Sequence, residues 1–255
     1  MFRLSAIVLL SAAAAFAQPK DLELFLLIGQ SNMAGRGVPE AADKQPIEGV
    51  YMLTKEMTWA PAVDPLHFDK PDIAGVGIGR SFAGTLRFLK PNAKIGLIPA
   101  AFGGTSLDEW KPGGKLYTDA VARAKKAMES GRLRGILWHQ GEADSASART
   151  ASNYRQRWIR FMENLRADLH AENVPVVVGQ LGEFYSPGNG GKGTYADVVN
   201  EQLATLVVAA PKVGFASSAG LKHKGDVVHF DTAALREFGV RYALAFLALD
   251  ASWRQ

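Results

Sequence analysis

The chain has 255 residues, 47% of them hydrophobic, and a formal net charge of +4 at pH 7. This length suits one large α/β domain, and the dispersed positive charge does not indicate nucleic-acid binding. The sequence contains no cysteine, which excludes disulfides, thiolate chemistry and cysteine-ligated zinc.

Residues 1–17 have the pattern of a cleaved signal peptide. Arg3 gives a short positive region, an apolar stretch follows, and Ala15-Phe16-Ala17 fits a small-residue cleavage site. The apolar stretch is shorter than the roughly 20 residues of a membrane-spanning helix, so an uncleaved anchor is the weaker alternative. We therefore expect residues 18–255 to form a single domain that is secreted or periplasmic and has no stable membrane insertion after cleavage.

Short apolar runs alternate with amphipathic segments along the rest of the chain, which is typical of parallel strands joined by helical crossovers. We expect five strands, near residues 22–29, 94–100, 134–139, 174–181 and 213–216. We expect five helices, near residues 79–89, 118–130 (closed by Gly131), 152–171, 195–209 and 232–249. This order predicts an α/β fold, a three-layer α/β/α sandwich around a five-stranded parallel sheet.

Two segments interrupt this alternation. Residues 36–78 are rich in proline and aromatic residues, and residues 186–193 are rich in glycine. Long loops in compact domains are usually functional or disordered. The first segment is therefore a candidate for a packed, substrate-facing loop, although its role stays open.

Several common motifs are absent. Residues 75–80 lack the third glycine of a dinucleotide-binding fingerprint, and Gly193 stands where a phosphate-binding P-loop has serine or threonine. Met33 stands where the nucleophile elbow of α/β-hydrolases has glycine. The five histidines show no metal-ligand spacing. We therefore expect neither a metal nor a cofactor.

Polar residues gather where predicted strands end. Ser31 follows the first strand, Gly103 the second and Gln140 the third, while Asp226 and His229 precede the last helix. Ligands of open α/β sheets bind beyond the carboxyl ends of the strands, so these residues could share one site. The alternative is structural: Ser31 would cap a helix and the other residues would form turns and caps.

These residue types suit acyl transfer. Ser31 would attack an acyl carbonyl, His229 would take its proton, and Asp226 would orient the imidazole. The backbone N–H groups of Ser31 and Gly103 and the Gln140 amide would stabilise the oxyanion.

Two further assignments stay open. Glu142 is an alternative acid for the histidine, because it lies two residues beyond Gln140 near the end of the same strand. Arg80 and Trp110 could contact a substrate, or they could be a surface residue and a core residue respectively.

Four segments resemble the successive blocks of a known family: GQSNMAG around Ser31, AFGGTS at 101–106, WHQGE at 138–142 and DVVH at 226–229. They are similar to the SGNH hydrolases, specifically the branch of sialate O-acetylesterases and the acetylxylan esterases of carbohydrate esterase family six. Gln140 stands where the wider superfamily has asparagine, which is normal for this branch.

The resemblance covers nearly all of residues 18–255 and implies a flavodoxin-like, SGNH-type esterase domain. It also implies metal-free removal of O-acetyl groups from a carbohydrate through an acyl-enzyme intermediate. A catalytically inactive, carbohydrate-binding relative is the alternative. The glycan and the oligomeric state stay open.

Overall fold

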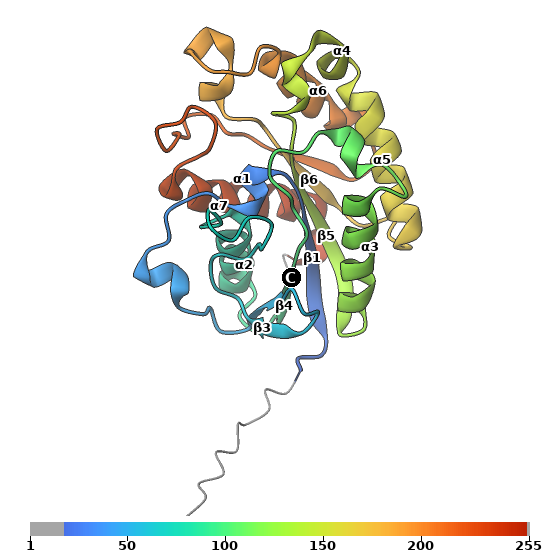
Figure 1. Cartoon of the computed structure of the whole chain (residues 1–255). Coiled ribbons are helices and arrows are strands. Elements are labelled where there is room, and N and C mark those ends of the chain that lie inside the picture. The colour runs from blue at the N-terminus through green and yellow to red at the C-terminus, as the bar shows by residue number, and fades with distance from the viewer. Residues whose placement is uncertain (1–17, 254–255) are drawn as a thin grey trace, which may run out of the picture.

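A central sheet of seven strands runs through residues 18–253, the part of the chain that the computed structural model describes (Figure 1). The signal-peptide prediction for residues 1–17 lies outside these residues. The strands are β1 (Leu22–Gly29), β2 (Val50–Leu53), β3 (Trp59–Pro61), β4 (Ile95–Pro99), β5 (Gly131–His139), β6 (Val176–Gly179) and β7 (Val213–Ala216). Their order across the sheet is β3-β2-β4-β1-β5-β6-β7, and only β2 and β3 pair antiparallel.

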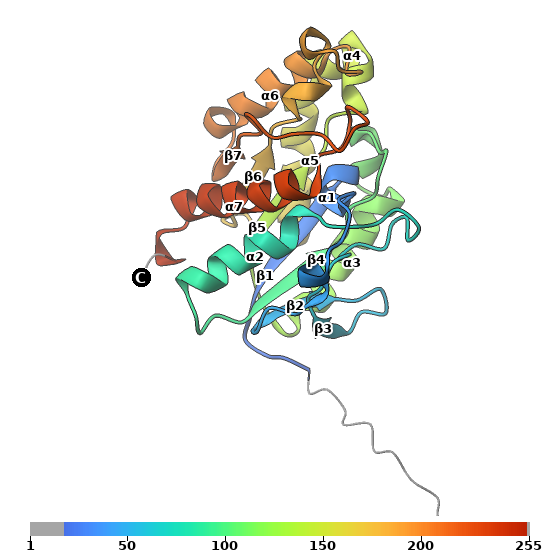
Figure 2. The ribbon, with the colours of Figure 1, turned by 90° about the vertical axis from the view of Figure 1, so that its left-hand side faces the viewer.

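The helices form layers on both faces of this sheet, so the α/β sandwich is confirmed. The α-helices are α1 (Ser31–Ala34), α2 (Ile78–Leu89), α3 (Lys115–Met128), α4 (Ala148–Ser152), α5 (Tyr154–Asp168), α6 (Ala196–Ala209) and α7 (Thr232–Leu249). Short 3₁₀ helices are found at Ala41–Lys44, Leu107–Trp110, Asp144–Ala146, Glu183–Tyr185, Pro187–Asn189 and Ala251–Trp253. Figure 2 shows α2 and α7 side by side on one face.

The alternation of side chains along β1 explains the two layers. Leu24, Leu26 and Ile28 pack into the cluster under α3, α5 and α6, whereas Phe25 and Leu27 pack into the cluster under α2 and α7. A strand with both faces buried needs large apolar residues at successive positions, which is the pattern of residues 24–28. Among the described helices, none is long and apolar enough to cross a membrane.

The expectation of five strands was wrong. All five expected strands are present, but the described chain also contains β2 and β3, which extend the sheet beyond β4. They lie inside the proline-rich segment 36–78 and have only four and three residues, with Pro61 ending β3. Such short strands are set by pairing across the sheet and leave no long apolar run in the sequence.

Two helix boundaries also differ from the expectation. The helix expected at 152–171 is two helices, α4 and α5, with a break at Asn153. Gly131 does not close α3, which ends at Met128; it begins β5 and pairs with Leu22.

Candidate active site

Ser31 lies at the carboxyl edge of the sheet, directly after the central strand β1. The chain turns sharply at Gly29, whose φ of 130° is rarely adopted by residues with a side chain. A Cβ at Gly29 would also collide with the backbone of His139 on the adjacent strand. The turn delivers Ser31 to the start of α1, where its side chain is largely buried.

Ser31, His229 and Asp226 form one hydrogen-bonded chain in the structure. His229 Nε2 lies 3.0 Å from Ser31 Oγ, and His229 Nδ1 lies 2.7 Å from Asp226 Oδ2. Asp226 Oδ1 accepts the backbone N–H groups of Val228 at 3.0 Å and His229 at 2.8 Å. The residues come from opposite ends of the chain, and the fold brings them together.

The electrostatics of Asp226 determine which nitrogen of His229 carries the proton. Burial raises the pKa of Asp226, but the backbone and imidazole N–H groups of His229 and the Val228 N–H together lower it to about 2. The carboxylate is therefore ionised at neutral pH and accepts a hydrogen bond from the N–H group at Nδ1 of His229. Nε2 is then free to accept the Ser31 hydroxyl proton.

The loop that carries His229 is held in an unusual conformation. Val227 has a φ of 55°, in the left-handed region that a β-branched residue rarely adopts. The Lys224 N–H donates to the His229 carbonyl at 2.9 Å, and Asp231 caps α7 by accepting the Ala234 N–H at 2.7 Å. The loop is thus anchored on both sides of the histidine.

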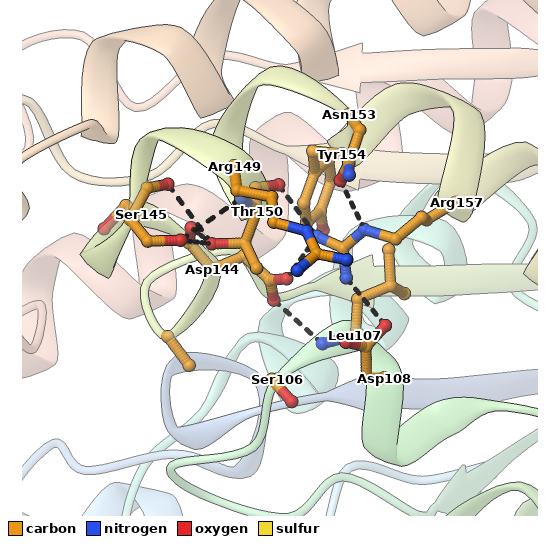
Figure 3. A network of polar contacts seen from close by, with 12 residues as sticks. Ser106, Leu107, Asp108, Asp144, Ser145, Arg149, Thr150, Asn153, Tyr154 and Arg157 are labelled. Carbon is orange, nitrogen blue, oxygen red and sulfur yellow. Dashed lines mark hydrogen bonds and ion pairs between the residues drawn. The ribbon is translucent and has the colours of Figure 1, made fainter.

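Gln140 is not placed as an oxyanion donor, which corrects the expectation from the sequence. Its side chain is fully buried, and Nε2 donates to the Thr105 carbonyl at 3.0 Å and to Asp144 Oδ2 at 2.7 Å. Both amide N–H groups are therefore used inside the protein. Asp144 itself accepts from Leu107 and is ion-paired with Arg157 (Figure 3). This network joins the segment after β5 to the segment after β4.

The Gly103 N–H is also committed to a protein acceptor. It donates to Asp69 Oδ2 at 2.8 Å, and Arg36 Nη2 donates to the same oxygen at 2.6 Å. The position of a Cβ on Gly103 would be 2.5 Å from Arg36 Nη2 and 3.3 Å from Ser31 Cβ, so this glycine lies directly against the serine. In this arrangement the Gly103 N–H points to Asp69, and an oxyanion would have to displace that carboxylate.

Asp69 and Arg36 form a buried ion pair that the sequence analysis missed. The charged side chains are 1% and 2% exposed. Burial raises the pKa of Asp69, but the Arg36 guanidinium and the Gly103 N–H outweigh it and hold the pKa below its usual value. Asp69 lies in the 36–78 segment, so this segment does reach the neighbourhood of Ser31. No sequence motif links the two residues to Gly103.

Glu142 is not placed to act as the alternative acid. Its Oε1 accepts from Asn32 Nδ2 at 2.6 Å and lies 3.6 Å from His139 Nε2, while Asp226 occupies Nδ1 of His229. The sequence singled out Glu142 but not its partners. Asn32 directly follows Ser31 and His139 ends β5, and only their contacts show that they belong to the site.

Arg80 and Trp110 both make their contacts with other parts of the protein. Arg80 donates to the backbone carbonyls of Ala42 and Gln45. Trp110 is fully buried and packs edge-on against Trp138. The structural alternative therefore describes both residues.

A cavity of about 810 Å³ lies beside the segment that carries Gly103, and its lining does not include Ser31, Asp226 or His229. Phe68, Asp69 and Phe102 line it, together with residues at the start of α3. Asp69 thus lies both in the cavity wall and on the Gly103 N–H. Among residues 18–253 there is no group of three or more histidine, aspartate or glutamate side chains that could hold a metal ion.

Comparisons with known proteins agree on one family. A family model described as carbohydrate esterase, sialic acid-specific acetylesterase, matches residues 21–248. The probable carbohydrate esterase At4g34215 of Arabidopsis thaliana is 33% identical over 248 residues, which cover 89% of this chain and 90% of that protein. Its X-ray structure superposes with a TM-score of 0.79 and 30% identity, over 89% of this chain and 98% of that one.

Two more distant structures share the fold. NanS has a TM-score of 0.73 at 17% identity, over 91% of this chain and 98% of its own. XAC1771, described as a novel carbohydrate acetylesterase from Xanthomonas citri, has a TM-score of 0.68 at 20% identity, over 90% of this chain and 57% of its own.

Proposed function

Because the chain belongs to the carbohydrate esterase, sialic acid-specific acetylesterase family, we propose that it removes O-acetyl groups from carbohydrates by a serine mechanism with an acyl-enzyme intermediate. The observation that carries the proposal is the chain of contacts from Ser31 Oγ through His229 to Asp226. A complete set of nucleophile, base and orienting acid argues against the alternative, a carbohydrate-binding relative without turnover.

The proposed reaction has two halves. Ser31 Oγ attacks the acetyl carbonyl while His229 Nε2 takes the hydroxyl proton, and the tetrahedral intermediate then collapses as the imidazolium returns that proton to the leaving sugar oxygen. Water next attacks the acetyl-serine carbonyl while His229 Nε2 accepts a proton from it. The second tetrahedral intermediate then collapses, the bond from Ser31 Oγ to the acetyl carbon breaks, the imidazolium returns its proton to Oγ, and acetate leaves. Asp226 stabilises the imidazolium in both halves and holds its tautomer.

The oxyanion donors follow from the hydrogen bonds already made. We assign the Ser31 backbone N–H as the donor available in this arrangement. The Gly103 N–H becomes a second donor when the substrate oxygen takes the place of Asp69. Gln140 has no donor to offer, because both of its amide N–H groups are held by Thr105 and Asp144.

We assign the sugar to the cavity beside Gly103. Its volume of about 810 Å³ lies within the usual range for small-molecule sites, about 300–1,000 Å³. Phe102 is 40% exposed at its wall and offers an apolar surface, while charged side chains at the rim offer hydrogen bonds to hydroxyl groups.

We further propose that residues 18–255 act as one SGNH-type domain, exported to the periplasm or the medium after removal of residues 1–17. N-terminal sequencing of protein recovered outside the cytoplasm tests this. A mature terminus at Gln18 is expected, and an intact Met1 on the exported protein would contradict it.

The experiment on activity is acetate release from a panel of substrates that includes acetylated xylo-oligosaccharides and O-acetylated sialic acids. We expect release from at least one acetylated sugar, and the preferred member identifies the glycan. Binding of an acetylated glycan without acetate release would instead favour the inactive relative.

A further inference from the structure

Glu142 is a buried carboxylate that the proposed mechanism does not use. It follows β5 and is 3% exposed. Burial raises the pKa of Glu142, but its contacts with His139 and Asn32 outweigh this and hold the pKa below its usual value. A charged group in such a position is costly unless it is paired, so its partners indicate what it does.

The partner with the shortest contact, Asn32, holds the backbone on both sides of His229. Asn32 Nδ2 donates to the Val228 carbonyl at 3.1 Å, and Asn32 Oδ1 accepts the Phe230 N–H at 3.2 Å. The same Nδ2 donates to Glu142 Oε1 at 2.6 Å. Two acceptors therefore face Nδ2 and one donor faces Oδ1, which leaves a single favourable orientation of the amide.

These contacts of Asn32 matter because the loop that carries His229 is strained. Val227, with its φ of 55°, lies two residues before His229, and a segment in that conformation keeps its shape only when surrounding contacts hold it. Asn32 supplies such contacts from the residue next to Ser31. It thus links the position of the imidazole to the position of the serine, 3.0 Å from Nε2.

Glu142 Oε1 also lies near His139, whose ring is held through Tyr242 of α7 and the carbonyl of Trp138 in β5. The Tyr242 hydroxyl donates its only proton to the Trp138 carbonyl at 2.9 Å, so it accepts from His139 Nδ1 at 3.0 Å. This fixes the ring of the fully buried His139 with Nε2 toward Glu142 Oε1. The ring thus lies 3.6 Å from Glu142 Oε1, the oxygen that also accepts from Asn32 Nδ2.

We propose that Glu142 is a positioning residue, which acts through Asn32 on the peptide groups flanking His229 and so holds the imidazole against Ser31. It touches neither substrate nor the reacting atoms. The inference rests on the proposed serine mechanism.

Two substitutions at Glu142 distinguish the effect of side-chain length from the effect of charge. Glu142→Asp keeps the charge but withdraws the carboxylate from Asn32 by one methylene group. Glu142→Gln keeps the length and an acceptor oxygen but removes the charge. We expect Glu142→Asp to lower kcat on p-nitrophenyl acetate about 100-fold with KM within about twofold, because only the geometry of proton transfer changes. Glu142→Gln should lose less than about tenfold, and the reverse order would overturn the proposal.

A double-mutant cycle tests whether Glu142 acts through Asn32. Asn32→Ala alone should lower kcat about 100-fold, and adding Glu142→Asp should lower it by no more than about a further threefold. Independent roles would multiply to about 10,000-fold and would overturn the proposal. If Glu142→Asp does not fold, a kcat for Asn32→Ala within about twofold of the parent overturns it equally.

The control is Asp168→Asn, a carboxylate-to-amide change at the end of α5, where Asp168 accepts from the Tyr117 hydroxyl at 2.6 Å. Its kcat should stay within about twofold of the parent. Failure of the proposed function is recognised separately: the unsubstituted protein would then release no acetate. An active parent with unchanged Glu142 and Asn32 variants contradicts only the positioning role.

Discussion

Replacing Asp226 by asparagine should stop proton transfer while leaving the loop in place. Asp226 Oδ1 holds the two backbone N–H groups of Val228 and His229, and the carbonyl oxygen of an asparagine can keep both bonds. Only Oδ2, which faces His229 Nδ1 at 2.7 Å, becomes an NH₂ group. That group donates to Nδ1, so the proton moves to Nε2 and faces Ser31, and the imidazole can no longer act as a base.

A tautomer error of this kind costs serine hydrolases about 10⁴-fold in kcat, which corresponds to about 5.4 kcal/mol at about 1.36 kcal/mol for each tenfold. We expect a loss of this size for Asp226→Asn on p-nitrophenyl acetate, with little change in KM. Glu142→Gln, measured in parallel, should lose less than about tenfold. A nearly harmless Asp226→Asn beside a crippling Glu142→Gln would refute the assignment and make Glu142 the acid of the triad.

Three further predictions concern pH, stability and the sugar. General-base catalysis needs an unprotonated imidazole, and the pKa of Asp226, about 2, keeps its carboxylate ionised, so activity should rise with pH through one step to which Asp226 does not contribute. EDTA should have no effect; loss in EDTA restored by a divalent ion would exclude the metal-free mechanism. Asp69→Ala leaves a buried arginine unpaired and should lower the free energy of unfolding by about 3–5 kcal/mol in urea, against less than about 1 kcal/mol for Asp119→Ala in an exposed pair; equal effects would contradict this. Phe102→Ala should raise KM about tenfold for an acetylated oligosaccharide but not for p-nitrophenyl acetate, and equal changes would place the sugar elsewhere.

The sheet shows which parts of the fold can be predicted from sequence. A strand buried on both faces, as β1 is from Leu24 onward, needs apolar residues at successive positions, and that run is visible in residues 24–28. In β2, by contrast, Tyr51 and Met52 are only partly buried, and β3 has three residues. β2 pairs with β4, which comes much later in the chain, and β3 pairs with β2, so no local pattern predicts either strand.

The site shows the same limit at atomic detail. The sequence places Ser31, Asp226 and His229 at one edge of the sheet, because strand ends and the last loop meet there. It also places Gln140 there correctly, but it cannot show that Thr105 and Asp144 already take both amide N–H groups. Hydrogen-bond partners are set by side-chain packing between distant segments, which spacing alone does not describe.

The most direct test of the serine mechanism compares acetate release by the unsubstituted protein and by Ser31→Ala on the acetylated sugar that the panel identifies. Circular dichroism should show that both are folded. We predict turnover by the parent and a kcat lower by at least about 10⁴-fold for Ser31→Ala, with the remaining rate due to binding and the oxyanion donor. A folded Ser31→Ala variant that releases acetate at the parent rate would contradict the serine mechanism.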